Sequence, residues 1–119
     1  MKQAGLALCL QQGLGIQRLA RLGTAHGLDE ALRRAALYEA AGADVIFVES
    51  PESEAELERI GKEVSKPLLA NMVEFGKTPR VEVERLKKWG FDLAIYPVLG
   101  LSVAAEAMRR SFAHLKDSG

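Results

Sequence analysis

The fold is decided by the stretch Gly42-Ala43-Asp44-Val45-Ile46-Phe47-Val48-Glu49, in which a glycine and an acidic residue lead into an almost unbroken apolar run. Such a β-branched run is typical of a strand that is buried on both faces of a parallel sheet. The preceding residues, Leu28 to Ala41, carry apolar side chains at helical spacing and end where Gly42 can terminate a helix. We therefore predict a helix followed by a buried strand.

The same order recurs further along the chain. Gly90-Phe91-Asp92 leads into the apolar run Asp92 to Pro97, and Pro67 to Asn71 forms another short run of this kind. Helical and strand-like segments that alternate in this way are typical of βα units around a parallel sheet. We predict an α/β fold with about three parallel strands and flanking helices.

Three further helix starts are indicated by residues that can cap an N-terminus: Ser53 with Glu56, Thr78 with Pro79, and Ser102. The first pair forms a capping box, and the second places proline at the first helical position. These signals predict helices over residues 53–64, 78–89 and 102–116, with a turn at Leu99-Gly100 before the last helix.

The first 22 residues differ from the rest. They are rich in leucine, but Gly13 and Gly15 interrupt any regular helix. We predict that residues 1–22 form an atypical, frayed helical segment without a targeting signal, and that residues 23–119 carry the repeated βα units. Cys9 lies between two leucines and is expected to be an inert buried thiol.

The overall composition excludes several classes of partner. Sixteen basic residues balance sixteen acidic ones, so no strong field would attract nucleic acid or an anionic membrane. A single cysteine cannot form an intramolecular disulfide, which fits a reducing cytoplasm. We expect a cytoplasmic protein with a small-molecule partner.

Polar residues lie where the predicted strands end. In parallel βα folds the chemistry is carried by the carboxyl ends of the strands, which here lead into Glu49-Ser50-Pro51, Asn71 to Thr78, and Pro97 to Gly100. A carboxylate can hold a hydrated divalent cation, and an amide can donate to a carboxylate. Alternatively, Asn71 and Glu74 satisfy backbone groups in a tight loop.

Other polar residues have structural roles in this interpretation. Asp44 and Asp92 precede their strands, so they lie at the opposite end of the sheet from Glu49. His26 and His114 have no nucleophile near them in sequence and are expected to be solvated or capping residues.

Three segments together resemble the isocitrate lyase / phosphoenolpyruvate mutase superfamily: Gly42 to Glu49, Leu68 to Pro79 and Ile95-Tyr96-Pro97. The relevant branch includes methylisocitrate lyase, dimethylmalate lyase, oxaloacetate decarboxylase and carboxyphosphonoenolpyruvate phosphonomutase. The resemblance runs from about Gly23 to the C-terminus. It implies that residues 23–119 are the C-terminal half of a (β/α)₈ TIM barrel.

The resemblance also implies an activity. It points to a Mg²⁺-dependent lyase, with Mn²⁺ as a substitute, that cleaves a C–C bond of a 2-hydroxy or 2-oxo di- or tricarboxylate through a pyruvate-type enolate. Glu49 would be the catalytic residue that contacts the metal through water, and Asn71 would bind a substrate carboxylate. The remaining substrate-binding residues would be Glu74, Gly76, Lys77, Thr78 and Pro97.

The chain departs from the family pattern in several places. A complete barrel takes about 250 residues, and the family's direct Mg²⁺ aspartates and loop cysteine have no counterpart here. Arg21 is not matched to the family's substrate arginine, because its surroundings predict a helix. Val73 and Ser102 stand where threonine and arginine are frequent, which favours a smaller oxo-acid or a dimethylmalate-like substrate over a tricarboxylate.

Two functions remain open. The chain could be the C-terminal portion of a lyase that works with a complementing N-terminal half or a second copy, or a catalytically inactive truncated barrel that serves as an interaction subunit. No general acid or base is identified, and the substrate and C–C versus C–P chemistry stay open. Because an open parallel sheet leaves two edges and a face uncovered, we predict self-association, as in a homo-oligomer.

Overall fold

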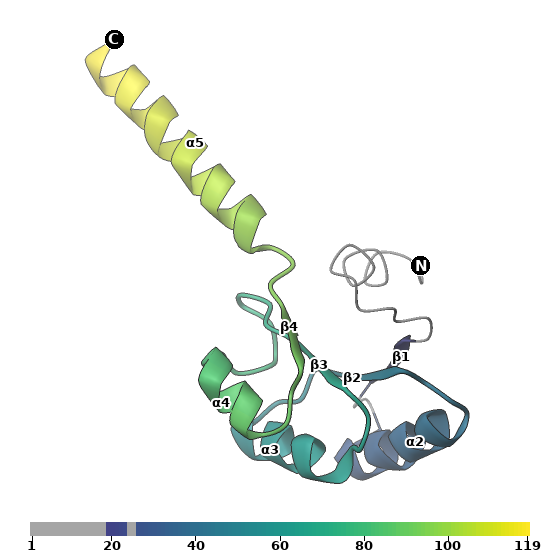
Figure 1. Ribbon diagram of the computed structural model, residues 1–119. Helices are drawn as coiled ribbons and strands as arrows, with labels where there is room; N and C mark the ends of the chain where they lie inside the picture. The colour runs from purple at the N-terminus through teal and green to yellow at the C-terminus, as the bar shows by residue number, and fades with distance from the viewer. Residues whose placement is uncertain (1–18, 24–25) are drawn as a thin grey trace.

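The computed structural model describes residues 19–23 and 26–119 (Figure 1). Its elements are, in chain order, β1 (Leu19–Gly23), α2 (Leu28–Ala40), β2 (Val45–Glu49), α3 (Glu54–Glu63), β3 (Leu68–Asn71), α4 (Val83–Lys88), β4 (Leu93–Ile95) and α5 (Leu99–Ser118). The four strands are parallel and lie in the order β1-β2-β3-β4. This order confirms the α/β fold class, with one strand more than the three predicted.

The additional strand, β1, corrects the prediction for the end of the N-terminal segment. Residues Leu19 to Leu22 were expected to be helical, but they pair with β2 in a register that runs from Leu19 opposite Val45 to Gly23 opposite Glu49. Arg21 therefore lies in a strand. Residues 1–18, with Cys9, lie outside the described residues, so the division of the chain at residue 22 stays a prediction.

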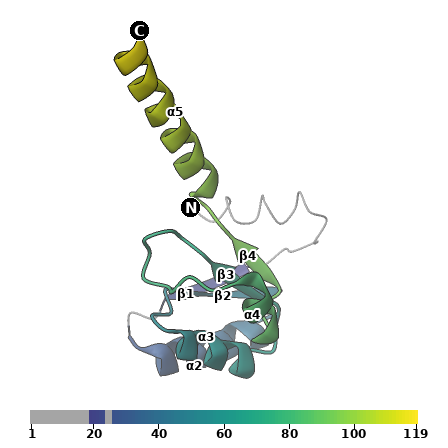
Figure 2. The same ribbon diagram turned by 90° about the vertical axis from the view of Figure 1, so that its left-hand side faces the viewer.

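The two faces of the sheet are packed differently. Helices α2, α3 and α4 cover one face (Figures 1 and 2), where Ile46, Val48 and Leu68 join Leu57 and Ile60 of α3 in the main core. Alternate strand residues form a second, smaller cluster on the other face, namely Val45, Phe47, Leu69, Leu93 and Ile95. The second face corresponds to the interior of a (β/α) barrel, where inward side chains pack in layers.

Two glycines end helices as predicted. Gly42 after α2 and Gly90 after α4 have φ angles of 88° and 93°, the left-handed region in which glycine is favoured. The N–H of each glycine donates to the carbonyl of the residue three positions earlier in the chain. The N–H of the residue after each glycine donates to the carbonyl five positions before that residue, as in a Schellman motif. The capping interaction at Ser53 is also confirmed, since the Glu56 N–H donates to Ser53 Oγ at 3.2 Å.

Two other predicted caps are wrong. Helix α4 begins at Val83, five residues after Thr78, because residues 78–82 run without helical structure and bury Val81 in the main core. Helix α5 begins at Leu99, and the Ser102 N–H donates to the carbonyl of Val98 at 2.9 Å, so Ser102 lies inside the helix instead of capping it.

Helix α5 extends away from the rest of the molecule in both views (Figures 1 and 2). Its twenty residues include none that is buried, and the molecule measures 62 × 30 × 26 Å along its principal axes. None of the helices that the structure describes is long and apolar enough to cross a bilayer.

Candidate functional site

Glu49 and Asn71 end two neighbouring parallel strands. Phe47 of β2 lies opposite Leu69 of β3, so the same register continued by two residues brings Glu49 level with Asn71. Phe47 and Leu69 belong to the cluster on the face away from the helices. Because side chains alternate along a strand, Glu49 and Asn71 are directed to that same face.

The chain turns sharply directly after Glu49. Ser50 has a φ of 58°, which a residue other than glycine seldom adopts, and its hydroxyl donates to Glu49 Oε1 at 3.3 Å. The turn therefore places a hydroxyl beside the carboxylate at the tip of β2. Backbone conformations of this kind are concentrated at binding and active sites.

Two buried oxygen atoms, one at the end of β3 and one in the loop after it, lack hydrogen-bond donors. Asn71 Oδ1 and Glu74 Oε2 are buried, and neither accepts a hydrogen bond within the described part of the chain. A buried acceptor without a donor typically costs about 1–3 kcal/mol. These two atoms do not satisfy backbone groups of the loop, and each can accept from an added donor.

The loop after β3 encloses most of the predicted substrate-binding residues. It contains no helix, and a cavity of about 470 Å³ is lined by Glu74, Gly76, Lys77 and Thr78. This volume lies within the range of small-molecule sites. Pro97 is not among the residues that line this cavity, although its neighbour Tyr96 is.

A second, much smaller cavity of about 10 Å³ is lined by residues of this loop and of the strand ends. Asn71 and Thr78 line it together with Ser50 and Pro51, which follow β2. Thr78 borders both cavities. Glu49 lines neither, so the structure brings Asn71 and Thr78 into one hollow and leaves Glu49 beside it, on the adjacent strand tip.

Phe75, Arg80 and Tyr96 are among the residues of the larger cavity that sequence reasoning missed. Tyr96 directly follows β4, and its position at a strand end could have indicated it. Arg80 was not considered as a loop residue of the site, because residues 78–89 were predicted to be helical. Phe75 has a φ of 63° and is fully exposed, which the sequence does not indicate.

The acidic residue at the other end of the sheet has a structural role, as predicted. Asp92 Oδ2 accepts from the Leu68 N–H at 3.0 Å, and the Asp92 N–H donates to the Leu68 carbonyl at 3.0 Å. Across residues 19–23 and 26–119, no three histidine, cysteine, aspartate or glutamate side chains come together as a metal-binding group.

Comparison with known proteins identifies the family. Residues 14–116 match the model of the phosphoenolpyruvate phosphomutase family. The chain belongs to this family. Among its relatives, the 2-methylisocitrate lyase of Halalkalibacterium halodurans is 50% identical over 93 residues, which make up 78% of this chain and 31% of that protein. The 2,3-dimethylmalate lyase of Eubacterium barkeri is 45% identical over 94 residues, 79% of this chain and 32% of that protein.

Solved structures of the family agree with this assignment. A crystal structure of 2,3-dimethylmalate lyase, described as a PEP mutase/isocitrate lyase superfamily member, superimposes with a TM-score of 0.78 at 34% identity, covering 98% of this chain and 42% of that one. Oxaloacetate acetylhydrolase in complex with 3,3-difluorooxalacetate gives a TM-score of 0.81 at 28% identity, covering 98% and 40%. The resemblance found in the sequence is thereby confirmed, and the chain spans about a third of the length of the curated relatives it matches.

Proposed function

We propose that this chain forms part of the substrate-binding end of a lyase that cleaves a C–C bond of a 2-hydroxy or 2-oxo di- or tricarboxylate through a pyruvate-type enolate. The observation that carries the proposal is the position of Asn71 beside Glu49 on one face of the sheet, with Asn71 Oδ1 buried and without a donor. The activities named for the relatives, 2-methylisocitrate and 2,3-dimethylmalate lyase, support the substrate class.

The chemistry of Asn71 matches such a substrate. A neutral side-chain amide has two N–H donors and one oxygen acceptor. In a 2-hydroxy acid a carboxylate and a hydroxyl stand on adjacent carbons, so the amide can donate to the carboxylate while Oδ1 accepts from the hydroxyl. The donor that Asn71 Oδ1 lacks in this chain would then come from the substrate.

Glu49 is proposed to contact a hydrated Mg²⁺ or Mn²⁺ ion through water. Its carboxylate at a strand tip fits this outer position, because hydrated Mg²⁺ commonly keeps several of its waters when a protein binds it. The described residues contain no group of three ligands and do not form a complete magnesium site by themselves. The metal would stabilise the enolate oxygen as a Lewis acid when other parts of the barrel supply its direct ligands.

The loop after β3 is proposed to hold the remainder of the substrate. Lys77 lines the larger cavity, and its Nζ lies 3.4 Å from Oε1 of Glu52. Arg80 lines the same cavity and adds a second cation. Gly76 allows the close approach of the backbone to Val73, whose carbonyl accepts the Gly76 N–H at 3.1 Å. Val73 supplies no side-chain donor to this cavity, which favours a dimethylmalate-like substrate over a tricarboxylate.

A second candidate is a non-catalytic interaction subunit. It is favoured by one observation, that a complete ligand set for the metal is missing from the described residues. This alternative predicts that no ligand raises the melting temperature, and that a complementing N-terminal half restores no activity.

A cytoplasmic location and a homo-oligomeric state remain parts of the proposal.

Thermal unfolding tests the proposal. We expect Mg²⁺ with oxalate or pyruvate to raise the melting temperature of the chain, since a ligand that binds only the folded state stabilises it. Asn71→Ala should abolish the rise, whereas the control Lys66→Ala, at the opposite end of β3, should retain it. No shift for the unmodified chain at millimolar ligand would favour the interaction subunit.

A further inference from the structure

The turn after β2 gives Ser50 a backbone conformation that local sequence does not favour. Its φ of 58° lies in the left-handed region, where glycine is the favoured residue. The next residue is Pro51, and a residue before proline is normally held in an extended conformation. Neither the serine nor the proline explains the turn, so the surrounding structure maintains it.

The turn changes the direction of the Ser50 side chain. Successive side chains of an extended strand point to opposite faces of the sheet. If β2 continued in that way beyond Glu49, Ser50 would be directed to the face that the helices cover, away from the Glu49 carboxylate. In the observed turn the Ser50 hydroxyl instead donates to Glu49 Oε1 at 3.3 Å. This contact between consecutive side chains depends on the turn.

Ser50 also connects Glu49 with the smaller cavity at the strand ends. Ser50, Asn71 and Thr78 are among the residues that line this cavity, whereas Glu49 is not. Asn71 Oδ1 is buried there and accepts no hydrogen bond from the described part of the chain. Ser50 therefore lies between the carboxylate and the amide of the proposed site, in contact with the first and bordering the same cavity as the second.

A hydrogen bond to one carboxylate oxygen sets the direction of both. The last side-chain torsion of a glutamate is broad, so a carboxylate without a partner samples many orientations. A donor on Glu49 Oε1 restricts that rotation before any cation arrives. Groups that orient a metal-contacting side chain in this way typically contribute about 10–100-fold to metal affinity.

We propose that Ser50 is a positioning residue, which holds the Glu49 carboxylate at the rim of the smaller cavity so that it meets the water of a hydrated cation. This role rests on the proposed function, since it needs a cation beside Glu49. The alternative is that Ser50 only ends the strand. Any residue that accepts the turn would then serve as well, and glycine accepts a positive φ best.

Two variants separate the hydroxyl from the turn. Ser50→Gly removes the hydroxyl and adopts a positive φ without strain, whereas Ser50→Ala removes the hydroxyl and keeps the Cβ atom. Electron paramagnetic resonance of free Mn²⁺, with the full chain and saturating oxalate, measures the Mn²⁺ affinity. Both variants should weaken it about threefold to tenfold, the contribution typical of one hydrogen bond. Thermal melts should show Ser50→Gly to be as stable as the unmodified chain.

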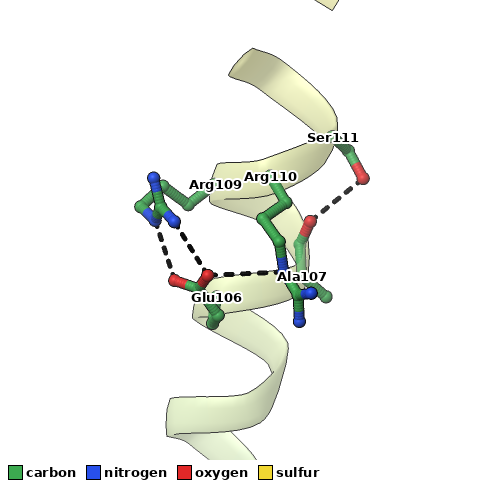
Figure 3. Close-up of polar contacts among 5 residues, drawn as sticks. All are labelled: Glu106, Ala107, Arg109, Arg110 and Ser111. Atoms are coloured by element: carbon green, nitrogen blue, oxygen red, sulfur yellow. Dashed lines mark hydrogen bonds and ion pairs between the residues drawn. The ribbon is translucent and has the colours of Figure 1, made fainter. Parts of the chain in front are cut away.

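A double variant shows whether Ser50 acts through Glu49. Glu49→Gln should weaken Mn²⁺ binding by itself, and adding Ser50→Gly should cause no further loss, because the positioned carboxylate is already gone. Ser111 supplies the control. Its Oγ donates to the Ala107 carbonyl at 3.0 Å within α5 (Figure 3), so Ser111→Ala removes a hydroxyl outside the site and should retain the full affinity.

Failure of the positioning role differs from failure of the proposed function. An unmodified chain that bound no Mn²⁺ with oxalate would overturn both. If Ser50→Gly bound Mn²⁺ as tightly as the unmodified chain, Ser50 would serve only the turn, and the positioning role alone would be overturned. Losses that multiplied in the double variant would also overturn it, because the hydroxyl would then act on a group other than Glu49.

Discussion

Gly61 of α3 lies against the carbonyl of Trp89, the C-terminal cap of α4, so closely that a Cβ atom on Gly61 would be 1.6 Å from that oxygen. The close neighbour is backbone, which cannot rotate away as a side chain can. We therefore expect Gly61→Ala to lower the free energy of unfolding by at least about 2 kcal/mol. Urea denaturation of the variant measures this loss.

Gly100 provides the matched control. It lies in α5, and a Cβ atom built on it meets no atom within 4 Å. Gly100 is the second residue of α5. Because alanine has a higher helix propensity than glycine, Gly100→Ala should leave stability unchanged or raise it slightly. An equal loss in both variants would show that the Gly61 contact is not the cause.

Glu39 of α2 joins its helix to the segment before β3. Its carboxylate accepts from the Ser65 N–H at 2.8 Å, from Ser65 Oγ at 3.0 Å and from the Lys66 N–H at 3.0 Å. Glu39→Ala should lower the free energy of unfolding by about 1–2 kcal/mol, since hydrogen bonds to a charged acceptor are lost. Glu58→Ala removes only the surface ion pair with Lys62, so it should lower the free energy of unfolding by less than about 0.5 kcal/mol. Thermal melts of the two variants measure both losses.

The two ends of the sheet should respond separately to mutation. Asp92 pairs with the backbone of Leu68 at one end, and Asn71 lies at the other. Asp92→Ala is expected to lower stability by about 1 kcal/mol and to leave oxalate affinity unchanged. Asn71→Ala should remove oxalate binding with little loss of stability, because Asn71 Oδ1 has no partner to lose. Calorimetry with both variants would contradict the account if Asp92→Ala weakened binding as much as Asn71→Ala.

The ion pair on α5 should make its stability depend on pH. Hydrogen bonds from Arg109 lower the pKa of Glu106 below its ordinary value of 4.5. A carboxyl whose pKa is lowered in the folded state stabilises that state above the unfolded pKa, and the contribution is lost as the pH falls through the folded pKa. The unmodified chain should therefore melt above Glu106→Gln at pH 7, and the difference should shrink as the pH falls through the folded pKa of Glu106. If the difference in melting temperature grew on acidification, it would contradict the lowered pKa of Glu106 in the folded state.

Local chemistry in the sequence was sufficient for much of the fold. The glycine caps at Gly42 and Gly90 and the serine cap at Ser53 depend on residues within one turn of each other, and the structure has all three. Strand β1 depends instead on pairing with β2, more than twenty residues away. Its short leucine-containing sequence has no pattern that separates a strand from a helix, so only the tertiary contact decides.

Tertiary packing also overrode the local signal for a helix start at Thr78 and Pro79. Thr78 and Pro79 have the chemistry of a helix start, but residues 78–82 form no helix and Val81 is buried in the main core. For the candidate site, strand ends predicted that Glu49 and Asn71 project into one shared cavity. The two residues end neighbouring strands on one face of the sheet, but Asn71 lines the smaller cavity and Glu49 lines neither. Arg80 and Tyr96 could not be assigned to the cavity in the same way, because the path of the loop determines which side chains line it.

Asn71 is the only asparagine in the sequence, so selective ¹⁵N-asparagine labelling gives one side-chain amide signal to follow by NMR. Titration with oxalate and Mg²⁺ should shift that signal saturably, and Glu49→Gln should weaken the Mg²⁺-dependent part of the shift. A side-chain signal that stays unchanged at saturating oxalate and Mg²⁺ would contradict the assignment of Asn71 as the carboxylate-binding residue.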